Sequence, residues 1–433
     1  MLKFANYQAV IPCAAYIAPL FDEQIENRQS NRATIMFQQG VRESMRRLPR
    51  MLQPLVTWVT GKPLDESKAR LIIPSVVDVL VSPLLAIIII YLLTICSKLD
   101  IAIAWPLIGV LWLLLVGILR KMQVTHLHHA IHNRLFEKSS LNKIYAKVIP
   151  PIITVQNWIE YRKEHLEHHN ASIFTTGKDA DAAFLAELGF LPGRSRGELW
   201  QNLWITILSP TFHALFLRVR LRSVLVQGKG YERVLAWTMV GVHLILGALL
   251  GLKVYLIAVF IPMALLYHVS ALLQFLTEHA WDVTGSAPDD WDSYAARCWG
   301  RFCGEAYPAR AGKGLAAVMR HVLDVTIWSV RMLLVHLPVR LACLVSDLPA
   351  HDWHHLAHRA GQSSRDWPRS LYLRQAAILG GDKPGFAKRE LWGISNMIEH
   401  QFRWLERTGR ARLTPSGNMV EATVDQQLLV VGE

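Results

Sequence analysis

The histidines of this chain gather in three short clusters whose spacing is typical of metal ligands. The clusters read His128-His129-Ala130-Ile131-His132, His165-Leu166-Glu167-His168-His169 and His351-Asp352-Trp353-His354-His355. Residues three and four positions apart share one face of a helix, so each cluster directs two or three imidazoles toward one point. Neutral imidazole is a common ligand of transition metals such as iron. Three such clusters in one chain therefore predict a metal site.

A further histidine, His279, follows Glu278 where a long apolar segment ends. One face of each cluster together with His279 supplies nine predicted metal ligands: His128, His132, His165, His168, His169, His279, His351, His354 and His355. Nine imidazoles exceed what one ion can use, and they favour two neighbouring ions. The register of the first cluster stays open, because His126 and His129 crowd it and His129 is an alternative partner for His132.

Acidic side chains within and beside the clusters are predicted to hold the imidazole rings in place. A ligating histidine usually donates its second ring N–H to a carboxylate, a carbonyl or water. We assign this role to Glu164, Glu167, Glu278 and Asp352, of which Glu278 is also a candidate direct ligand. For His358 the sequence leaves two interpretations open, a supporting role beside the metal site and a surface position. The remaining histidines that we interpret as structural are His213, His243, His268, His321, His336 and His400.

The elements that must position these residues are apolar helices. The chain has 433 residues, of which 52% are hydrophobic, and a mean hydropathy of +0.23, which indicates a membrane protein with sizeable polar parts. A helix needs about 20 mostly apolar residues to span a bilayer. Short connections at Lys98-Leu99-Asp100 and at Lys253 join the candidate spans into two hairpins. The four predicted spans cover residues 71–96, 101–119, 234–252 and 254–277.

Two other apolar stretches are expected to lie at the membrane surface. Residues 203–217 are interrupted by Ser209-Pro210, and residues 325–345 contain Arg331, His336 and Arg340. Charged groups are unfavourable at the centre of a bilayer, whereas an interfacial helix tolerates them.

Charge predicts the orientation of the hairpins. The connections inside them carry few of the 46 lysines and arginines, and the segments outside them carry most. The positive-inside rule then places both termini and all three clusters in the cytoplasm, at the inner membrane if the source is bacterial. Basic flanks that face anionic lipid account for the net charge of +12. We predict no nucleic-acid partner, because no basic, aromatic-interleaved soluble domain is present.

These observations predict an all-α integral membrane protein with four transmembrane helices in two hairpins. A cytoplasmic helical cap carries the histidine-rich site. Residues 1–70 form a cytoplasmic N-terminal helical or interfacial segment, 71–360 the membrane domain, and 361–433 a cytoplasmic C-terminal segment. The apolar residues 9–21 are expected to be packed or surface-lying rather than a signal peptide. The tail beyond Thr414 is expected to be loosely structured.

Several metalloprotein classes are excluded by motifs that the sequence lacks. No HExxH occurs, as a membrane zinc protease requires, and no Glu-x-x-His pair, as a ferritin-like carboxylate site requires. The five cysteines form no CxxC, so no rubredoxin-like iron site is fused to the chain. No HPGG-type haem module is present either. Any electrons must therefore come from a separate protein.

The order HxxxH, HxxHH, two spans and HxxHH resembles the membrane fatty-acid desaturase family and its relatives, the alkane hydroxylases and carotenoid ketolases. The segment 274–279 resembles the extra histidine element of those enzymes, and 176–181 resembles their acidic turn. The resemblance covers roughly residues 70–360. It implies a four-span helical fold, a di-iron centre, O2 as oxidant, and an external electron donor of the ferredoxin, rubredoxin or cytochrome b5 type with its reductase.

Two features depart from family patterns. Phe275 stands where some members place an asparagine four residues before the extra histidine, so a water-mediated asparagine ligand is in doubt. The long stretch between the second and third clusters, which includes two spans, argues against the sterol-desaturase type.

Three functions remain open at this point. The first is an O2-dependent di-iron desaturase that introduces a double bond into a fatty-acyl or similar lipid chain, entering through an apolar tunnel between the spans. The second is a related hydroxylase or monooxygenase, with oxidative decarboxylation as a variant. The third is a metal transporter or sensor, which would place ligands inside the spans rather than beyond them. We predict the desaturase. The substrate head group, the chain length and the position of oxidation are not fixed by the sequence.

Overall fold

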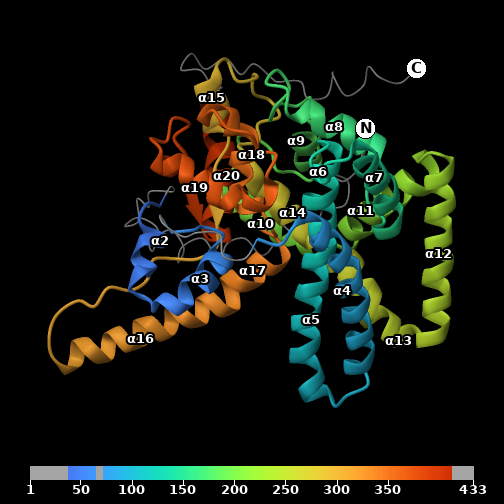
Figure 1. Ribbon diagram of the computed structural model, residues 1–433, viewed down its shortest axis with the longest axis horizontal. Helices are drawn as coiled ribbons and strands as arrows, with labels where there is room; N and C mark the ends of the chain where they lie inside the picture. Colours follow the sequence, from blue (N-terminus) through green and yellow to red (C-terminus); the bar gives the residue numbers. More distant parts are fainter. Residues whose placement is uncertain (1–37, 65–71, 412–433) are drawn as a thin grey trace.

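A long helical hairpin forms one side of the molecule. The computed structural model describes residues 38–64 and 72–411. Helix α4 (Ser75–Cys96) and helix α5 (Ile101–Lys121) run antiparallel and are joined by a tight turn (Figure 1). Asp100 ends this turn, and its side chain accepts a hydrogen bond of 3.0 Å from the backbone N–H of Ala102. This cap satisfies a free donor of the first helical turn. The two helices lie within a few residues of the first two predicted spans.

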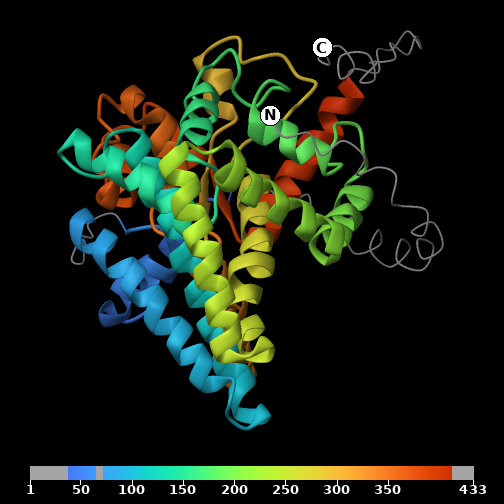
Figure 2. The same ribbon diagram turned by 90° about the vertical axis from the view of Figure 1, so that its right-hand side faces the viewer.

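A second hairpin packs beside the first. Helix α12 (Gly230–Leu250) is followed by Gly251, whose φ of 78° lets the chain reverse. The returning arm consists of α13 (Leu252–Tyr255), the π-helical segment η8 (Leu256–Leu266) and α14 (Tyr267–Glu278). Trp112 joins the hairpins by donating its indole N–H to the carbonyl of Ile257 at 2.8 Å. Figure 2 shows the two hairpins side by side in one bundle.

A fifth long apolar helix lies outside the four predicted spans. It consists of α16 (Leu315–Arg331), η9 (Met332–His336) and α17 (Leu337–Ala342). Within the described residues, five helices are therefore long and apolar enough to cross a membrane. Figure 1 shows α16 at a steep angle to α4 and α5. The surface location of residues 325–345 and the count of four spans both stay predictions.

Helix α17 reaches the first hairpin through a close backbone contact. At Gly117 of α5, an added Cβ would lie 1.9 Å from the carbonyl oxygen of Leu341. Only glycine permits this approach. The segment that precedes the third histidine cluster therefore packs against α5, the helix that leads into the first histidine cluster.

The remaining helices form a cap at one end of the bundle (Figure 1). Those between the two hairpins are α6 (His128–Ile131), α7 (Ser139–Ile153), α8 (Trp158–His168), α9 (Ala180–Glu187), α10 (Arg196–Leu208), α11 (Pro210–Arg222) and the π-helical η7 (Ser223–Gln227). Those after the second hairpin are α15 (Trp291–Ala296), η10 (Leu348–Ala350), α18 (His351–Leu356), η11 (Ala357–Ala360), η12 (Trp367–Arg369), α19 (Ser370–Leu379), η13 (Phe386–Lys388) and α20 (Ile394–Ala411). The predicted break at Ser209-Pro210 is confirmed, since α10 ends and α11 begins there.

The two ends of the described chain are built into this cap. Strand β1 (Gly300–Phe302) pairs in parallel with β2 (Glu390–Trp392), so the C-terminal segment shares a sheet with the preceding region. The N-terminal elements are α2 (Val41–Ser44), η4 (Met45–Arg47), η5 (Arg50–Leu52) and α3 (Gln53–Thr60). Lys62, just after α3, forms a buried ion pair with Glu390. The predictions for residues 9–21 and for the tail beyond Thr414 lie outside the described residues.

Candidate metal centre

Four helix ends bring the histidine clusters together at one end of the bundle. Helix α5 continues through the π-helical segment η6 (Met122–Leu127) into α6, which carries the first cluster. Helix α8 carries the second cluster and α18 the third, and His279 follows the last residue of α14. In Figure 1 these elements lie at the end opposite to the turn between α4 and α5. The hairpins thus return the chain to the same end each time.

All nine predicted histidine ligands converge. The ring nitrogens of eight of them form two groups of four, and within each group the potential ligand atoms lie within 4.8 Å of one another. His169 lies between the groups: its Nε2 is 3.0 Å from that of His165, and its ring stacks on that of His355 with a centroid distance of 4.4 Å. We call the first group His128, His132, His165 and His354, and the second group His168, His279, His351 and His355.

The first group has more nitrogen contacts than its protons can satisfy. The Nε2 atom of His354 lies 3.0–3.2 Å from three other Nε2 atoms, those of His128, His132 and His169. A neutral imidazole has one N–H, and a protonated ring nitrogen cannot accept a hydrogen bond. One proton on His354 can point at only one of its three neighbours. A cation among these nitrogens would use all the lone pairs at once.

The spacing in this group fits a metal ion. A metal–imidazole bond is about 2.1 Å, as for zinc, so two ligands at a right angle lie about 3 Å apart. The distance between the Nε2 atoms of His165 and His132 is 2.9 Å, and that between His354 and His132 is 3.2 Å. The donor set and its spacing therefore fit an ion coordinated by neutral imidazoles.

In the second group, a backbone carbonyl fixes the tautomer of His279, and a hydroxyl contacts the outer nitrogen of His355. His279 donates its Nδ1–H to the carbonyl of Arg297 at 3.2 Å, because a carbonyl can only accept. The lone pair of His279 is then on Nε2, which is buried and has no hydrogen-bond partner in the described chain. Nδ1 of His355 lies 2.9 Å from the hydroxyl of Tyr294. Such partners on the outer nitrogen are typical of metal-bound histidines.

His168 is held by a carboxylate in the acidic turn that follows the second cluster. Its Nδ1 lies 2.8 Å from Oδ2 of Asp179, which also caps α9 by accepting from the backbone N–H of Asp181 at 3.1 Å. Asp179 is buried, so the interaction is weakly screened by solvent. One residue thus begins a helix and orients a predicted ligand.

Burial keeps most of the other rings neutral. It lowers the pKa of His132 to about 3, and it lowers the pKa values of His165, His351 and His355 well below 6.5. Burial also opposes the charged form of His168, but the Asp179 carboxylate outweighs it and raises the pKa to about 9. Neutral rings offer the lone pairs that metal binding requires, whereas His168 must lose a proton first.

The structure places His128 rather than His129 with His132. Nε2 of His129 lies 2.8 Å from Oδ2 of Asp347, and its ring stacks on Trp367. His126 also points elsewhere, with Nε2 2.9 Å from Asp78. The geometry therefore favours the His128–His132 register.

The four predicted supporting carboxylates have different surroundings. Glu278 lies beside the second group, with Oε1 3.1 Å from Nε2 of His351. Asp352 instead forms a buried ion pair with Arg374 at 2.9 Å, and among the described residues no histidine pairs with it. Its side chain points away from the histidines because the buried guanidinium needs a counter-charge. Glu167 is exposed, and Glu164 accepts from Gln156 at 2.6 Å.

The residues that sequence reasoning missed are the partners of the rings. Asp179, Tyr294 and the carbonyl of Arg297 each contact Nδ1 of a predicted ligand, and Asp347 contacts His129. Only Asp179 had a sequence signal, since it lies in the acidic turn after the second cluster. His358, left open above, is exposed and packs against the ring of Trp291, away from both groups.

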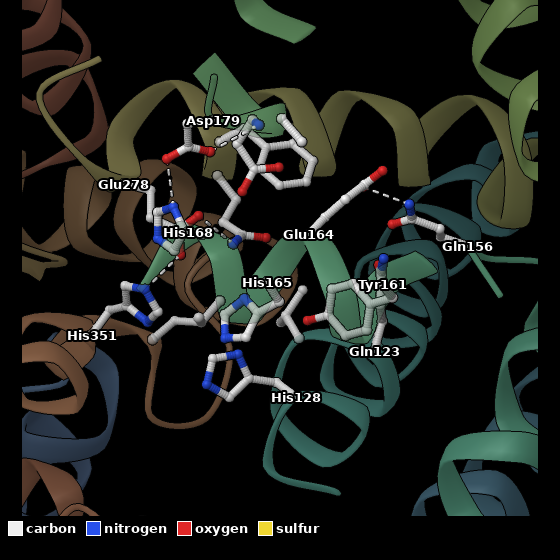
Figure 3. A pocket seen from close by; sticks show the side chains of 16 residues that line it. Gln123, His128, Gln156, Tyr161, Glu164, His165, His168, Asp179, Glu278 and His351 are labelled. Atoms are coloured by element: carbon white, nitrogen blue, oxygen red, sulfur yellow. Dashed lines mark hydrogen bonds and ion pairs between the residues drawn. The ribbon is translucent and has the colours of Figure 1, made fainter. Parts of the chain in front are cut away.

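A small cavity opens beside both histidine groups (Figure 3). Its volume is about 80 Å³, and its lining includes His128 and His165 of the first group and His168 and His351 of the second. Most other lining side chains are polar, so this space differs from the apolar tunnel expected from the sequence.

One comparison with known proteins identifies the family. Residues 104–305 match the family model described as Fatty acid desaturase. This match supports the membrane fatty acid desaturase family and confirms the resemblance drawn from the histidine pattern. The match includes the first two clusters and His279, and it ends before the third. No curated protein and no solved structure matches the chain. The family match supports an oxidoreductase that acts on a lipid chain.

Proposed function

We propose that this chain is an O2-dependent di-iron desaturase that introduces a double bond into a fatty-acyl or similar lipid chain. The observation that carries the proposal is the convergence of the histidines into two groups of four with a ninth ring between them. Two adjacent groups suit two ions, and an all-imidazole donor set suits iron. The family match supports a lipid chain as the substrate class.

The protein's part in this reaction is to hold and orient the ligands. When bound, the iron pair would supply the O2-dependent oxidation that side chains alone cannot perform. The first group would hold one ion and the second group the other, with His169 within reach of both. Asp179, Tyr294 and the Arg297 carbonyl keep the outer nitrogens occupied, so that the Nε2 lone pairs face inward. Glu278 contacts His351 and would lie beside the second ion.

Hydroxylation is the second candidate, and the cavity favours it in one respect. Desaturation removes two hydrogens from the substrate, whereas hydroxylation leaves an oxygen on it. Hydrogen-bonding side chains beside both histidine groups would accommodate a product hydroxyl. The two reactions share the site and the electron requirement.

The proposed partners and location follow from the same chemistry. A separate donor of the ferredoxin, rubredoxin or cytochrome b5 type, with its reductase, would supply two electrons per turnover. The lipid would reach the site from the membrane. The positive-inside distribution of lysine and arginine supports a cytoplasmic site and cytoplasmic termini.

The first test is the metal content of the detergent-purified protein. We expect about two irons per chain, because each of the two groups of imidazole ligands would bind one ion. Alanine in place of His168, His354 or His355 should lower the iron content and abolish turnover while membrane insertion is retained. His400→Ala is the control, because His400 packs against the ring of Trp299, outside both groups. Zinc, or no stoichiometric metal after iron-replete expression, would contradict the proposal.

The second test is the product mass. Loss of two hydrogens would identify desaturation, and gain of one oxygen would identify hydroxylation. Both reactions should stop without O2 or without a reduced donor. Turnover under strict anaerobiosis would rule out the proposed mechanism.

A further inference from the structure

The two histidine groups differ in their access to solvent. All four rings of the second group are buried, whereas His132 and His354 of the first group are partly exposed. His169, which lies between the groups, is also partly exposed. Figure 1 shows α6, α8 and α18 at the end of the molecule opposite to the turn between α4 and α5. A soluble protein can therefore approach the first group more closely than the second.

Basic side chains border the exposed part of the first group. Burial lowers the pKa of His132, and the nearby charges of Arg134 and Arg162 lower it further. The charge of Arg134 also acts on His169, in the same direction. Arg365 in turn lies close enough to Arg134 to lower the pKa of its guanidinium, after burial. Three arginines from separate parts of the chain thus gather beside these rings.

A surface groove continues this basic border away from the histidines. Its volume is about 450 Å³, and residues of α6, α7 and α8 line it. Ile131 and Asn133, on either side of His132, form part of the lining. Lys143 and Arg162 are its charged residues, and no acidic residue lines it. The groove therefore joins Lys143 to the arginines beside the first group.

These four residues form one positively charged surface, which we name the basic edge. The basic edge consists of Arg134, Lys143, Arg162 and Arg365. Among residues 38–64 and 72–411, none of the four forms an ion pair. Lys143, Arg162 and Arg365 are exposed. Their charges are therefore available to a partner.

The position of the basic edge favours a protein partner of negative charge. Opposite charges across an interface guide the encounter of two proteins and raise its rate. The reaction proposed above takes two electrons from outside the chain, and the basic edge borders the more exposed of the two proposed ion sites. Anionic lipid headgroups also attract basic residues. The basic edge, however, lies beside the histidine rings at the end of the bundle, where a soluble electron carrier would need to dock.

We propose that the basic edge is the docking surface for an acidic one-electron carrier protein, and that electrons enter the metal centre through the first histidine group. The inference rests on the proposed function and adds the surface charge of the partner and the place of electron entry. In each encounter the reduced carrier loses one electron and leaves oxidised. Two electrons, two protons and the two hydrogens removed from the substrate convert one O2 into two waters, so the desaturation is balanced.

Binding of a carrier tests the docking surface without turnover. The protein is placed in nanodiscs of uncharged lipid under nitrogen, and its affinity for an oxidised, acidic [2Fe–2S] ferredoxin is measured. Between ionic strengths of about 0.01 M and about 0.15 M the screening length falls from about 30 Å to about 8 Å, so the affinity should fall by about tenfold or more. A basic cytochrome c is the carrier of opposite charge, and it should bind far more weakly than the ferredoxin.

Charge reversal assigns the binding to the basic edge. Lys143→Glu and Arg162→Glu change exposed side chains, and each should weaken ferredoxin binding by about tenfold at the lower ionic strength. The loss should lie mainly in the association rate, because these charges act before contact. Lys388→Glu is the matched control and should leave the affinity unchanged. Lys388 is also exposed, and it lies in η13 next to α19, on the opposite side of the cap from α7 (Figure 1).

Electron entry is tested on the iron-loaded protein. At a ferredoxin concentration below the dissociation constant, reduction of the iron by reduced ferredoxin should be about tenfold slower in both variants of the basic edge. An unchanged rate would mean that electrons enter elsewhere and would overturn the inference.

Three binding results would also overturn it. These are unchanged ferredoxin binding in both variants, equal binding of the basic cytochrome, and binding of phosphatidylserine vesicles but not of ferredoxin. Iron content is measured on the same samples. Two irons without ferredoxin binding would contradict only this inference, whereas absence of iron would contradict the proposed function on which it depends.

Discussion

Nδ1 of His168 lies 2.8 Å from Oδ2 of Asp179, and this contact sets the direction in which the ring faces the second histidine group. The two residues come from α8 and from the N-cap of α9, with the acidic turn between them. Since Nδ1 is occupied, Nε2 is the nitrogen available to a metal. The carboxylate also makes the ring more basic, so that Nε2 donates its lone pair to a metal more strongly.

Removal of Asp179 should weaken the second ion selectively. For Asp179→Ala we expect a loss of metal affinity on the order of 10–100-fold at one of the two sites, as for other carboxylates that support a ligating histidine. Metal titration followed by elemental analysis would measure it. Lys178→Ala, an exposed change in the same turn, is the matched control. Equal loss of both ions would show that Asp179 supports the whole cap rather than one ring.

The first cluster offers a direct test of register. His128→Ala should remove a ligand from the first group and reduce the iron content toward one ion per chain. His129→Ala should leave both irons bound, because His129 faces Asp347 and Trp367 instead. Iron content and the electronic spectrum of the two variants would be compared. The reverse pattern would establish the His129–His132 register.

Metal binding at the second group should depend on pH through His168. The raised pKa of about 9 means that the metal-free ring is protonated at pH 7. In the metal-free protein this shift stabilises the fold fully below about pH 6.5, and the effect is lost as pH rises through about 9. A metal must displace this proton, so its apparent affinity should rise about tenfold per pH unit between pH 7 and 8.

Zinc is a suitable redox-inert probe for this pH dependence. Titrations at pH 7 and 8 would give the slope, and Asp179→Asn should flatten it, since the neutral amide no longer raises the pKa of His168. An affinity that does not change with pH in the unmodified protein would mean that His168 is neutral before the metal binds.

A buried charge network supports the third cluster. Asp352 pairs with Arg374, and Arg374 pairs with Glu390, each at 2.9 Å. Arg374→Ala leaves Asp352 buried without a counter-charge, while Glu390 keeps its pair with Lys62, and we expect the change to lower the free energy of unfolding by about 3–5 kcal/mol. Denaturation in detergent would measure it. Arg369→Ala is the control, because its 3.7 Å pair with Asp366 is half exposed and contributes about 0–1 kcal/mol.

The histidine ligands of the site were predictable from the sequence because they follow helical periodicity. The i, i+3 and i+4 spacing of histidines gave the nine rings that the structure brings together, and apolar length gave four helices within a few residues of their bounds. These signals are local. The break at Ser209-Pro210 was predictable for the same reason.

The parts that the sequence did not predict depend on contacts between distant segments. Asp347 reaches His129, and Tyr294 reaches His355, across loops with no periodic pattern. Asp352 lies inside a histidine cluster and was therefore assigned to a histidine, but the position of Arg374 was needed to place it. The pairing of β1 with β2 was likewise missed, because each strand has only three residues.

Each histidine group combines residues made early and late in synthesis. The first group needs His354, and the second needs His351 and His355, although their other members precede residue 280. The growing chain therefore offers no complete ion site until the third cluster has left the ribosome. Arg374 and Glu390, which hold that cluster through Asp352, emerge later still. Iron uptake should consequently be among the last steps of biogenesis, after the apolar helices have entered the membrane.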